Sequence, residues 1–226
     1  MTRVRALAAA LVLLVPTACA SSGDSRQRAF DRRIERANPS AVIAQELAFA
    51  RAAQERGQWT AFAEFAGDNA VLFVPQPVEA RAWLRGQVNP PQAVRWQPHQ
   101  VWSSCDGTLA LSKGAWQRPD GTTGYFTTAW QRKQLGAYRW TMDQGDTLEQ
   151  PLPAPDLIGA TVASCSPRPT PVEWPAAGSA GEYRGLSEDG TFFWHVSVEA
   201  GNARSVTAGY WDGSAWQQAV VERVAG

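Results

Sequence analysis

The chain has 226 residues, of which 44% are hydrophobic and 19% are charged, and its 21 basic side chains balance 21 acidic ones. This zero net charge argues against a nucleic-acid-binding protein, which would carry a basic excess on one face, and its 11 Trp, 8 Phe and 4 Tyr argue against a disordered chain. Only 2 His and 3 Cys are available as metal ligands besides carboxylates, so we predict neither a metal nor a cofactor.

The first 18 residues are predicted to be a cleaved export signal. Arg3 and Arg5 precede an uncharged apolar run at residues 6–15. A membrane-spanning helix needs about 20 apolar residues, so this run is too short to span and fits the apolar region of a signal peptide. The polar and highly charged stretch that follows, residues 19–38, is predicted to be a tether.

The end of this signal resembles the lipobox of bacterial lipoproteins, because small Thr17 and Ala18 stand directly before Cys19. The resemblance implies cleavage before Cys19, lipidation of that residue, and a durable membrane anchor of several acyl chains. Pro16 departs from the lipobox pattern, which prefers Leu at that position. The alternative to a lipoprotein signal is ordinary signal-peptide cleavage after Ala20. Ala20 is not the Asp associated with inner-membrane retention, so the resemblance implies an exported, periplasmic protein anchored to the outer membrane.

Three helices and one short strand are predicted at the start of the folded part. Pro39 fits the first turn of a helix capped by Asn38 or Ser40, and Gly57 supplies its left-handed stop. The residues of this helix that follow one another at helical spacing, with Phe49 beside them, are Ile43, Leu47, Ala50 and Ala53. Further helices are predicted at 58–66 and 78–85, and a strand is predicted at 70–74 between them.

After residue 91 the hydrophobic period changes from helical to two, which predicts four long antiparallel strands. Asp-Gly pairs at 106–107 and 120–121 suit the tight turns between them, because these residues tolerate the positive φ that hairpin turns impose. The predicted strands are 93–104, 109–118, 124–133 and 137–143.

A proline-rich linker at 151–181 is predicted to separate a first domain, 39–150, from a small β meander at 182–226. Seven of the 15 prolines fall in this region, and only residues 157–165 read as a strand. The meander strands are predicted at 181–184, 191–199, 205–211 and 215–223. About 50 residues make little core of their own, so we expect the meander to pack on the first domain.

Cys105 and Cys165 are predicted to form a disulfide. Two cysteines in an exported chain are more often paired than free, and this pair would close a loop of about 60 residues. The alternative is a pair of buried thiols.

The predicted order of helix, helix, strand, helix and four strands resembles the nuclear-transport-factor-2-like (SnoaL-like) cone, over roughly residues 40–145. The sequence motifs that carry the resemblance include Trp96-x-Pro98, Gly114-x-Trp116 and Trp140-x-x-Asp143-x-Gly145. The resemblance extends to exported members of that superfamily without an assigned function. It implies an α+β fold in which a cone-shaped curved antiparallel sheet packs on three N-terminal helices, followed here by a small all-β meander. It also implies a conical pocket, but no particular reaction.

Asp143 and His99 are the candidate catalytic residues, because a carboxylate or a histidine inside such a cone can transfer protons. They would act together only if both point inward, and a turn role for Asp143 or a surface role for His99 is the alternative. Aromatic residues at these spacings ordinarily pack in a core, and the candidates that could instead line the pocket are Trp59, Phe62, Tyr125 and Trp130. His195 is predicted to lie on the solvent face of a half-buried strand.

These observations leave three functional hypotheses. The first is a non-catalytic envelope lipoprotein whose cone binds a small apolar ligand or a protein partner. The second is a SnoaL-like isomerase, cyclase or dehydratase that uses Asp143 and His99. The third is a structural or interaction component of the cell envelope that uses the C-terminal meander. The predicted partners are a membrane, contacted through the lipid on Cys19, and a second copy docked through the sheet face, with no nucleic acid.

Overall fold

The computed structural model describes residues 37–133, 136–174 and 180–226. The predicted signal peptide, Cys19 and nearly all of the predicted tether lie outside these ranges. Within the described ranges, no helix combines the length and the apolar character needed to cross a membrane.

The three predicted helices are present, as α2 (Pro39–Arg56), α3 (Gln58–Phe65) and α4 (Ala80–Leu84). Asn38 caps α2 by accepting a hydrogen bond from the Ala41 N–H, at 3.2 Å. Gly57 ends α2 with a φ of 101°, a conformation that glycine adopts without strain, as predicted. The next helix begins at once, because Asn89 accepts hydrogen bonds from two of its first N–H groups.

The face of α2 that packs on the sheet differs from the predicted one. The buried residues are Val42, Glu46, Phe49, Ala52 and Ala53, whereas Leu47 is 41% exposed. The predicted stripe was therefore wrong by about one residue, since this alanine-rich helix offers two overlapping stripes and only one contains Phe49.

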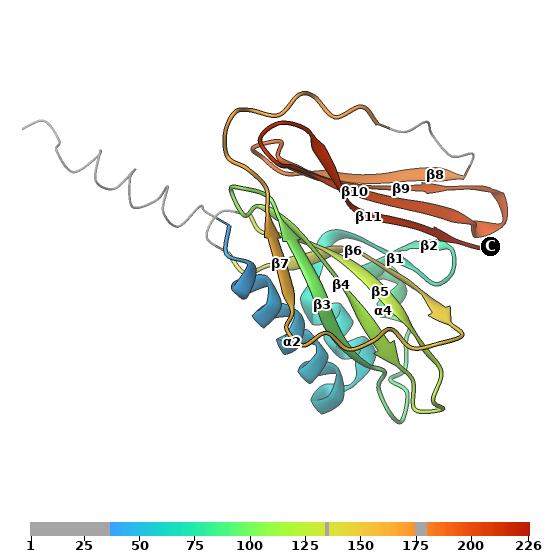
Figure 1. Cartoon of the computed structure of the whole chain (residues 1–226). Coiled ribbons are helices and arrows are strands. Elements are labelled where there is room, and N and C mark those ends of the chain that lie inside the picture. The colour runs from blue at the N-terminus through green and yellow to red at the C-terminus, as the bar shows by residue number, and fades with distance from the viewer. Residues whose placement is uncertain (1–36, 134–135, 175–179) are drawn as a thin grey trace, which may run out of the picture. The chain divides into compact units, whose positions relative to one another are not determined.

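A seven-stranded sheet carries the helices on one face (Figure 1). Its strands are β1 (Ala66–Phe73), β2 (Pro77–Glu79), β3 (Arg95–Ser103), β4 (Leu109–Gln117), β5 (Thr123–Gln131), β6 (Arg139–Leu148) and β7 (Gly159–Val162). Their spatial order is β2-β1-β6-β5-β4-β3-β7. The predicted α+β fold class and the cone arrangement are confirmed.

Two pairings of this sheet are parallel, which corrects the predicted all-antiparallel sheet. β1 runs parallel to β6, and β7 runs parallel to β3. The β7 strand lies in the segment predicted as a linker, within the stretch 157–165 that was predicted as its one strand. A parallel neighbour joins strands far apart in sequence and leaves no hairpin signal, which is why the periodicity did not reveal it.

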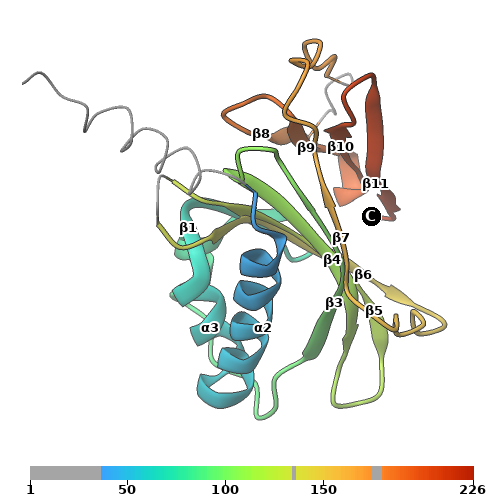
Figure 2. The same ribbon diagram turned by 60° about the vertical axis from the view of Figure 1, so that its left-hand side comes forward.

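A second sheet of four antiparallel strands covers the opposite face of the first (Figure 2). Its strands are β8 (Gly181–Leu186), β9 (Phe192–Val198), β10 (Arg204–Trp211) and β11 (Trp216–Val224), with a short 3-10 turn, η1 (Ala200–Asn202), before β10. Leu111 and Met142 of the first sheet pack against Phe192, Val196 and Val206 of the second. The meander therefore packs on the cone, and a dimer through this sheet face would require the second sheet to move away.

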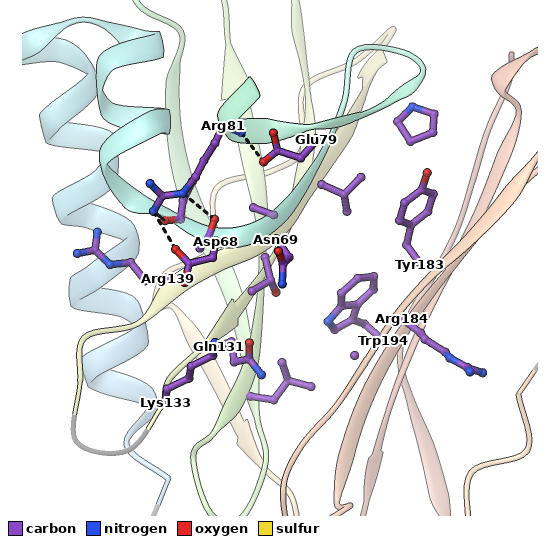
Figure 3. Close-up of a pocket in the computed structure, with 18 of the residues that line it drawn as sticks. Asp68, Asn69, Glu79, Arg81, Gln131, Lys133, Arg139, Tyr183, Arg184 and Trp194 are labelled. Carbon is purple, nitrogen blue, oxygen red and sulfur yellow. Dashed lines mark hydrogen bonds and ion pairs between the residues drawn. The ribbon is translucent and has the colours of Figure 1, made fainter. Parts of the chain in front are cut away.

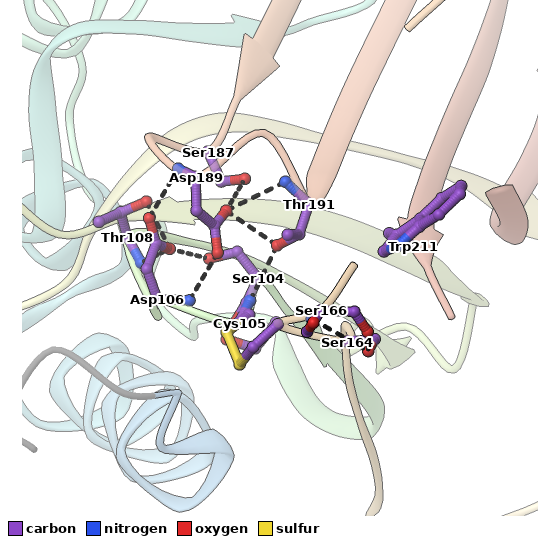
Figure 4. Close-up of a disulfide and its surroundings, with 12 residues drawn as sticks. Ser104, Cys105, Asp106, Thr108, Ser164, Ser166, Ser187, Asp189, Thr191 and Trp211 are labelled. Carbon is purple, nitrogen blue, oxygen red and sulfur yellow. Dashed lines mark hydrogen bonds between the residues drawn. A yellow bond between two sulfur atoms is a disulfide. The ribbon is translucent and has the colours of Figure 1, made fainter. Parts of the chain in front are cut away.

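Two turns with the same sequence pattern, Ser-x-Asp-Gly-Thr, join the sheets at residues 104–108 and 187–191 (Figure 4). In each turn the serine hydroxyl donates to Oδ1 of the aspartate, at 2.6 Å in the first and 2.7 Å in the second. The contact between them is reciprocal: the Asp106 N–H donates to Asp189 Oδ2 at 2.8 Å, and the Asp189 N–H donates to Asp106 Oδ2 at 2.9 Å. We call this pair of turns the aspartate clasp.

The predicted disulfide lies beside the clasp. Cys105 and Cys165 are bonded, with their Cα atoms 5.2 Å apart (Figure 4). Cys105 belongs to the first clasp turn, and Cys165 follows β7 on the edge of the seven-stranded sheet. The disulfide therefore fixes the chain that leaves β7 to the place where the two sheets meet.

Candidate functional site

A pocket of about 590 Å³ lies inside the cone, between the three helices and the concave face of the sheet, and Val224 and Ala225 near the end of β11 also line it. The large aromatic side chains that line its walls are Phe49, Trp59, Phe62, Phe73, Trp83, Trp96, Trp116 and Phe126. The volume of the pocket and its aromatic lining suit a small, mainly apolar molecule.

The aromatic walls are held by contacts with one another. The ring centroids of Trp59 and Trp83 are 5.2 Å apart, and those of Trp59 and Phe62 are 5.4 Å apart, each pair edge to face. Phe49 packs edge to face against both Phe62 and Trp96, with ring centroids 4.8 Å apart in each pair. Such packing fixes the ring orientations, so the cavity is preformed rather than created by a ligand.

Two of the four predicted pocket residues line the pocket, Trp59 and Phe62. Trp130 is fully buried in the core behind it and donates a hydrogen bond to Glu46. Tyr125 lies on the opposite face of β5, beneath the second sheet, where Lys113 approaches its ring at 5.1 Å. Because strand residues alternate between faces, Tyr125 and Trp130, five positions apart, could not both have faced the cone.

Asp143 lines the pocket from β6 and is its inner polar group. Its Oδ2 accepts a hydrogen bond from the Thr128 hydroxyl on the neighbouring strand, at 2.6 Å. The pKa of Asp143 is raised to about 7, mainly by burial; the hydrogen bond from Thr128 lowers it and the nearby Glu46 carboxyl raises it. Near neutral pH this carboxyl can therefore both donate and accept a proton.

His99 does not meet Asp143. It sits at a bulge in β3, between Pro98 and Gln100, and it is absent from the pocket lining. Strands β4 and β5 separate β3 from β6, which is about 14 Å at the usual strand spacing. Burial lowers the pKa of His99, but the structure does not bring the two predicted catalytic residues together.

Glu46 is the interior carboxyl that the sequence analysis missed. It is fully buried on α2, where three groups donate hydrogen bonds to it: Trp96 Nε1 at 2.8 Å, the Ser112 hydroxyl at 2.5 Å and Trp130 Nε1 at 3.0 Å. Burial raises its pKa, partly offset by these donors. Its position between Val42 and Phe49 on the buried stripe was a usable signal, because a charged residue there must find polar partners.

His195 is on the outer face of the second sheet as predicted, but it is not exposed to solvent. Only 1% of it is accessible, its Nε2 lies 3.0 Å from Glu182 Oε1, and the Trp174 ring packs beside it at 6.0 Å. The chain before β8 covers this face. Among the described residues, no cluster of three or more His, Cys, Asp or Glu side chains could hold a metal ion.

A second hollow of about 1260 Å³ lies between the two sheets, beside β1 and β8 (Figure 3). Several of its charged groups are already engaged: Arg81 lies 3.5 Å from Asp68 and also binds backbone carbonyls, and Glu79 caps α4. Figure 3 shows Arg184 pointing away from the hollow, where its guanidinium lies over Trp174. The better-organised site is therefore the cone pocket.

No family model and no curated protein matches this chain. Among solved structures, a provisionally named aromatic ring hydroxylase from Novosphingobium aromaticivorans is 16% identical, with a TM-score of 0.37 over 50% of this chain and 91% of that one. A provisionally named ketosteroid isomerase from Parabacteroides distasonis is 12% identical, with a TM-score of 0.39 over 51% of this chain and 97% of that one. The function is therefore inferred from this chain's own residues.

The raised pKa of Asp143 predicts that stability falls as pH rises. Between about pH 4 and pH 7 the unfolded chain has lost this proton while the folded protein keeps it, so the free energy of unfolding decreases over that window and levels off above it. Since the pocket admits some solvent, we expect about 2 kcal/mol, less than the full shift would give. The measurement is urea denaturation at several pH values.

Two variants assign this dependence to Asp143. In Asp143→Asn the decline between about pH 4 and pH 7 becomes shallower, leaving the part due to Glu46. In Thr128→Val the decline extends to higher pH, because Thr128 lowers the pKa of Asp143. An unchanged profile in Asp143→Asn would show that the carboxyl is not held protonated.

Proposed function

We propose that this protein binds a small, mainly apolar molecule in the cone pocket. The observation that carries the proposal is a preformed cavity with aromatic walls and the half-buried carboxyl of Asp143 among its few polar groups. Apolar walls supply the affinity through the area that they remove from water, and a few polar groups fix the ligand's orientation. A hydroxyl or carbonyl on the ligand would satisfy Asp143.

The test uses the neutral fluorescent probe N-phenyl-1-naphthylamine. We expect it to bind with about one molecule per chain and to quench the tryptophans that line the pocket. Val94→Trp fills the pocket from its wall and should weaken binding at least about tenfold. The matched control is Val88→Trp, because Val88 is 88% exposed and lies outside the pocket. Equal binding by the two variants would refute the cone as the binding site.

A second candidate function is proton-transfer catalysis by Asp143 acting without His99. The observation that favours it is the pKa of about 7, which suits a general acid or base at neutral pH. Under this alternative, turnover of a carbonyl substrate, read as exchange of its α-protons in deuterated water, is lost in Asp143→Asn. Probe binding survives in that variant. No exchange above that of Asp143→Asn for any bound carbonyl compound would leave binding as the sole function.

An envelope assembly role for the second sheet has less support. Its apolar face packs on the cone, and among the described residues of 182–224 only Leu186 and Val221 are large hydrophobic side chains that are substantially exposed. Two separated apolar side chains do not make a docking surface.

We further propose that the protein is exported and anchored to a membrane through a lipid on Cys19. The support is the sequence of the first 20 residues, and the disulfide is compatible with an oxidising compartment. Expressed in a bacterial host with labelled palmitate, the chain should carry label and fractionate with membranes. Cys19→Ser should lose the label and become releasable. Label retained in Cys19→Ser would refute the anchor.

A further inference from the structure

Arg204 is a buried cation at the outer end of the cone pocket. It comes from β10 of the second sheet, is 3% exposed, and belongs to the pocket lining together with Pro75 and Gly145. Its guanidinium lies over the Phe73 ring, 5.1 Å from the centroid. The second sheet therefore completes a site whose other walls belong to the cone.

The hydrogen-bond partners of Arg204 are all neutral. Its Nε donates to Gln144 Oε1 at 3.1 Å, one terminal nitrogen donates to the Gly145 carbonyl at 2.9 Å, and the other donates to the Pro75 carbonyl at 3.4 Å. A guanidinium has five N–H groups, so two are left without a partner among the described residues. Arg204 also forms no ion pair with any residue of the described ranges.

The buried carboxylate nearest in this network is occupied elsewhere. Glu222 accepts hydrogen bonds from the Gln144 amide at 2.5 Å and from the Thr127 hydroxyl at 2.9 Å, and Lys113 lies 2.6 Å from it. Gln144 thus stands between Glu222 and Arg204. Asp146 lines the pocket too, and its Oδ1 accepts from the Thr147 N–H. Both carboxyls favour the charged form of Arg204, but neither pairs with it directly, so an anionic ligand would offset the remaining cost of burying the guanidinium.

We propose that the ligand of the cone pocket is an anionic amphiphile, with an apolar, ring-containing body among the aromatic side chains and a carboxylate or sulfonate head on Arg204. This inference rests on the proposed binding function and specifies its ligand class. The head group accepts hydrogen bonds from the two N–H groups of Arg204 that have no partner among the described residues. The Asp143 carboxyl at the inner end of the pocket disfavours a ligand with a second anionic group at that end.

The test compares two probes of similar shape and different charge. 1-Anilinonaphthalene-8-sulfonate carries an anionic head, and N-phenyl-1-naphthylamine is its neutral counterpart. We expect wild-type protein to bind the sulfonate at least about tenfold more tightly. Arg204→Gln should abolish this preference while changing affinity for the neutral probe less than about twofold. Arg204→Lys should keep part of the preference, because the charge remains but the planar fork of donors is lost.

The matched control is Arg223→Gln, which removes an exposed arginine from the neighbouring strand outside the pocket. It should leave both affinities unchanged. A structural role of Arg204 alone would lower the affinities for both probes together, and that result would overturn the inference, as would equal wild-type affinities for the two probes.

A second measurement does not depend on any variant folding. On wild-type protein, naphthalene-2-carboxylate should displace N-phenyl-1-naphthylamine at about a tenth of the concentration that naphthalene-2-carboxamide requires. Equal potency would overturn the inference while the binding function stands. If neither naphthylamine probe binds, the binding function itself is wrong, and the inference falls with it.

Discussion

Replacing Glu46 by leucine is expected to lower the free energy of unfolding by about 3 kcal/mol, although leucine matches the apolar surroundings. The two indole N–H groups and the Ser112 hydroxyl that donate to this carboxyl would remain buried without their acceptor. Each such loss costs about 1–3 kcal/mol, and removing the buried acid itself offsets part of the sum. The measurement is urea denaturation near pH 6, with the midpoint and the slope compared.

Two further variants separate loss of the acceptor from loss of helix packing. Glu46→Gln keeps one acceptor oxygen and should cost about 1 kcal/mol, because its amide group faces groups that also donate. Glu55→Leu makes the same exchange at an exposed position of α2 and should change stability by less than about 0.5 kcal/mol. A Glu46→Leu variant as stable as Glu55→Leu would show that the buried acceptor contributes nothing.

The local elements were predictable because each depends on neighbouring residues. Asn38, Pro39 and Gly57 marked the first helix. The period of two located β3 to β5 within two residues of their ends, whereas β6 runs five residues beyond its predicted end. Alternation also placed Trp194 and His195 on opposite faces of β9. It could not show that Trp174, from a distant segment, covers His195, because alternation distinguishes the faces of a strand and not what packs on them.

The candidate site was only partly predictable for the same reason. Asp143 lines the pocket beside Leu72 of β1, in a parallel pairing between segments about 70 residues apart that no local pattern announces. The predicted pairing of Asp143 with His99 was wrong, because the distance between their side chains depends on the order of the strands in the sheet and not on their order in the sequence. Arg204 lies beyond the cone domain, so a resemblance that ends near residue 145 gave no reason to consider it.

The two turns of the aspartate clasp share a sequence pattern that was not recognised as a repeat. The Asp-Gly pair at 106–107 was predicted as a turn, but the full pattern Ser-x-Asp-Gly-Thr occurs both at 104–108 and at 187–191. Within each turn the aspartate accepts from its own serine and threonine, which leaves Oδ2 free for the other turn. A repeated turn of this kind positions the second sheet, and with it Arg204, over the mouth of the cone.

Removing the disulfide by Cys105→Ser together with Cys165→Ser is expected to lower the free energy of unfolding by about 4 kcal/mol. The bond closes a loop of 60 residues, and such a loop constrains the unfolded chain by roughly that amount. Cys165 is exposed, so dithiothreitol should destabilise the wild-type protein equally without prior unfolding. Thermal and urea denaturation, each with and without reductant, measure the effect, and the serine variant should be insensitive to reductant.

The contributions of the aspartate clasp and of the disulfide to the free energy of unfolding should be coupled, because Cys105 lies within one clasp turn. Asp189→Ala removes the acceptor for the Asp106 N–H and for its own serine and threonine, at an expected cost of about 2 kcal/mol in the oxidised protein. In the double-serine background we expect a cost that differs by at least about 0.5 kcal/mol, as contacting groups are not additive. Asp120→Ala, in an exposed hairpin turn away from the second sheet, should give the same small cost in both backgrounds. Strict additivity for Asp189 would mean that the turns and the disulfide hold the two sheets together independently.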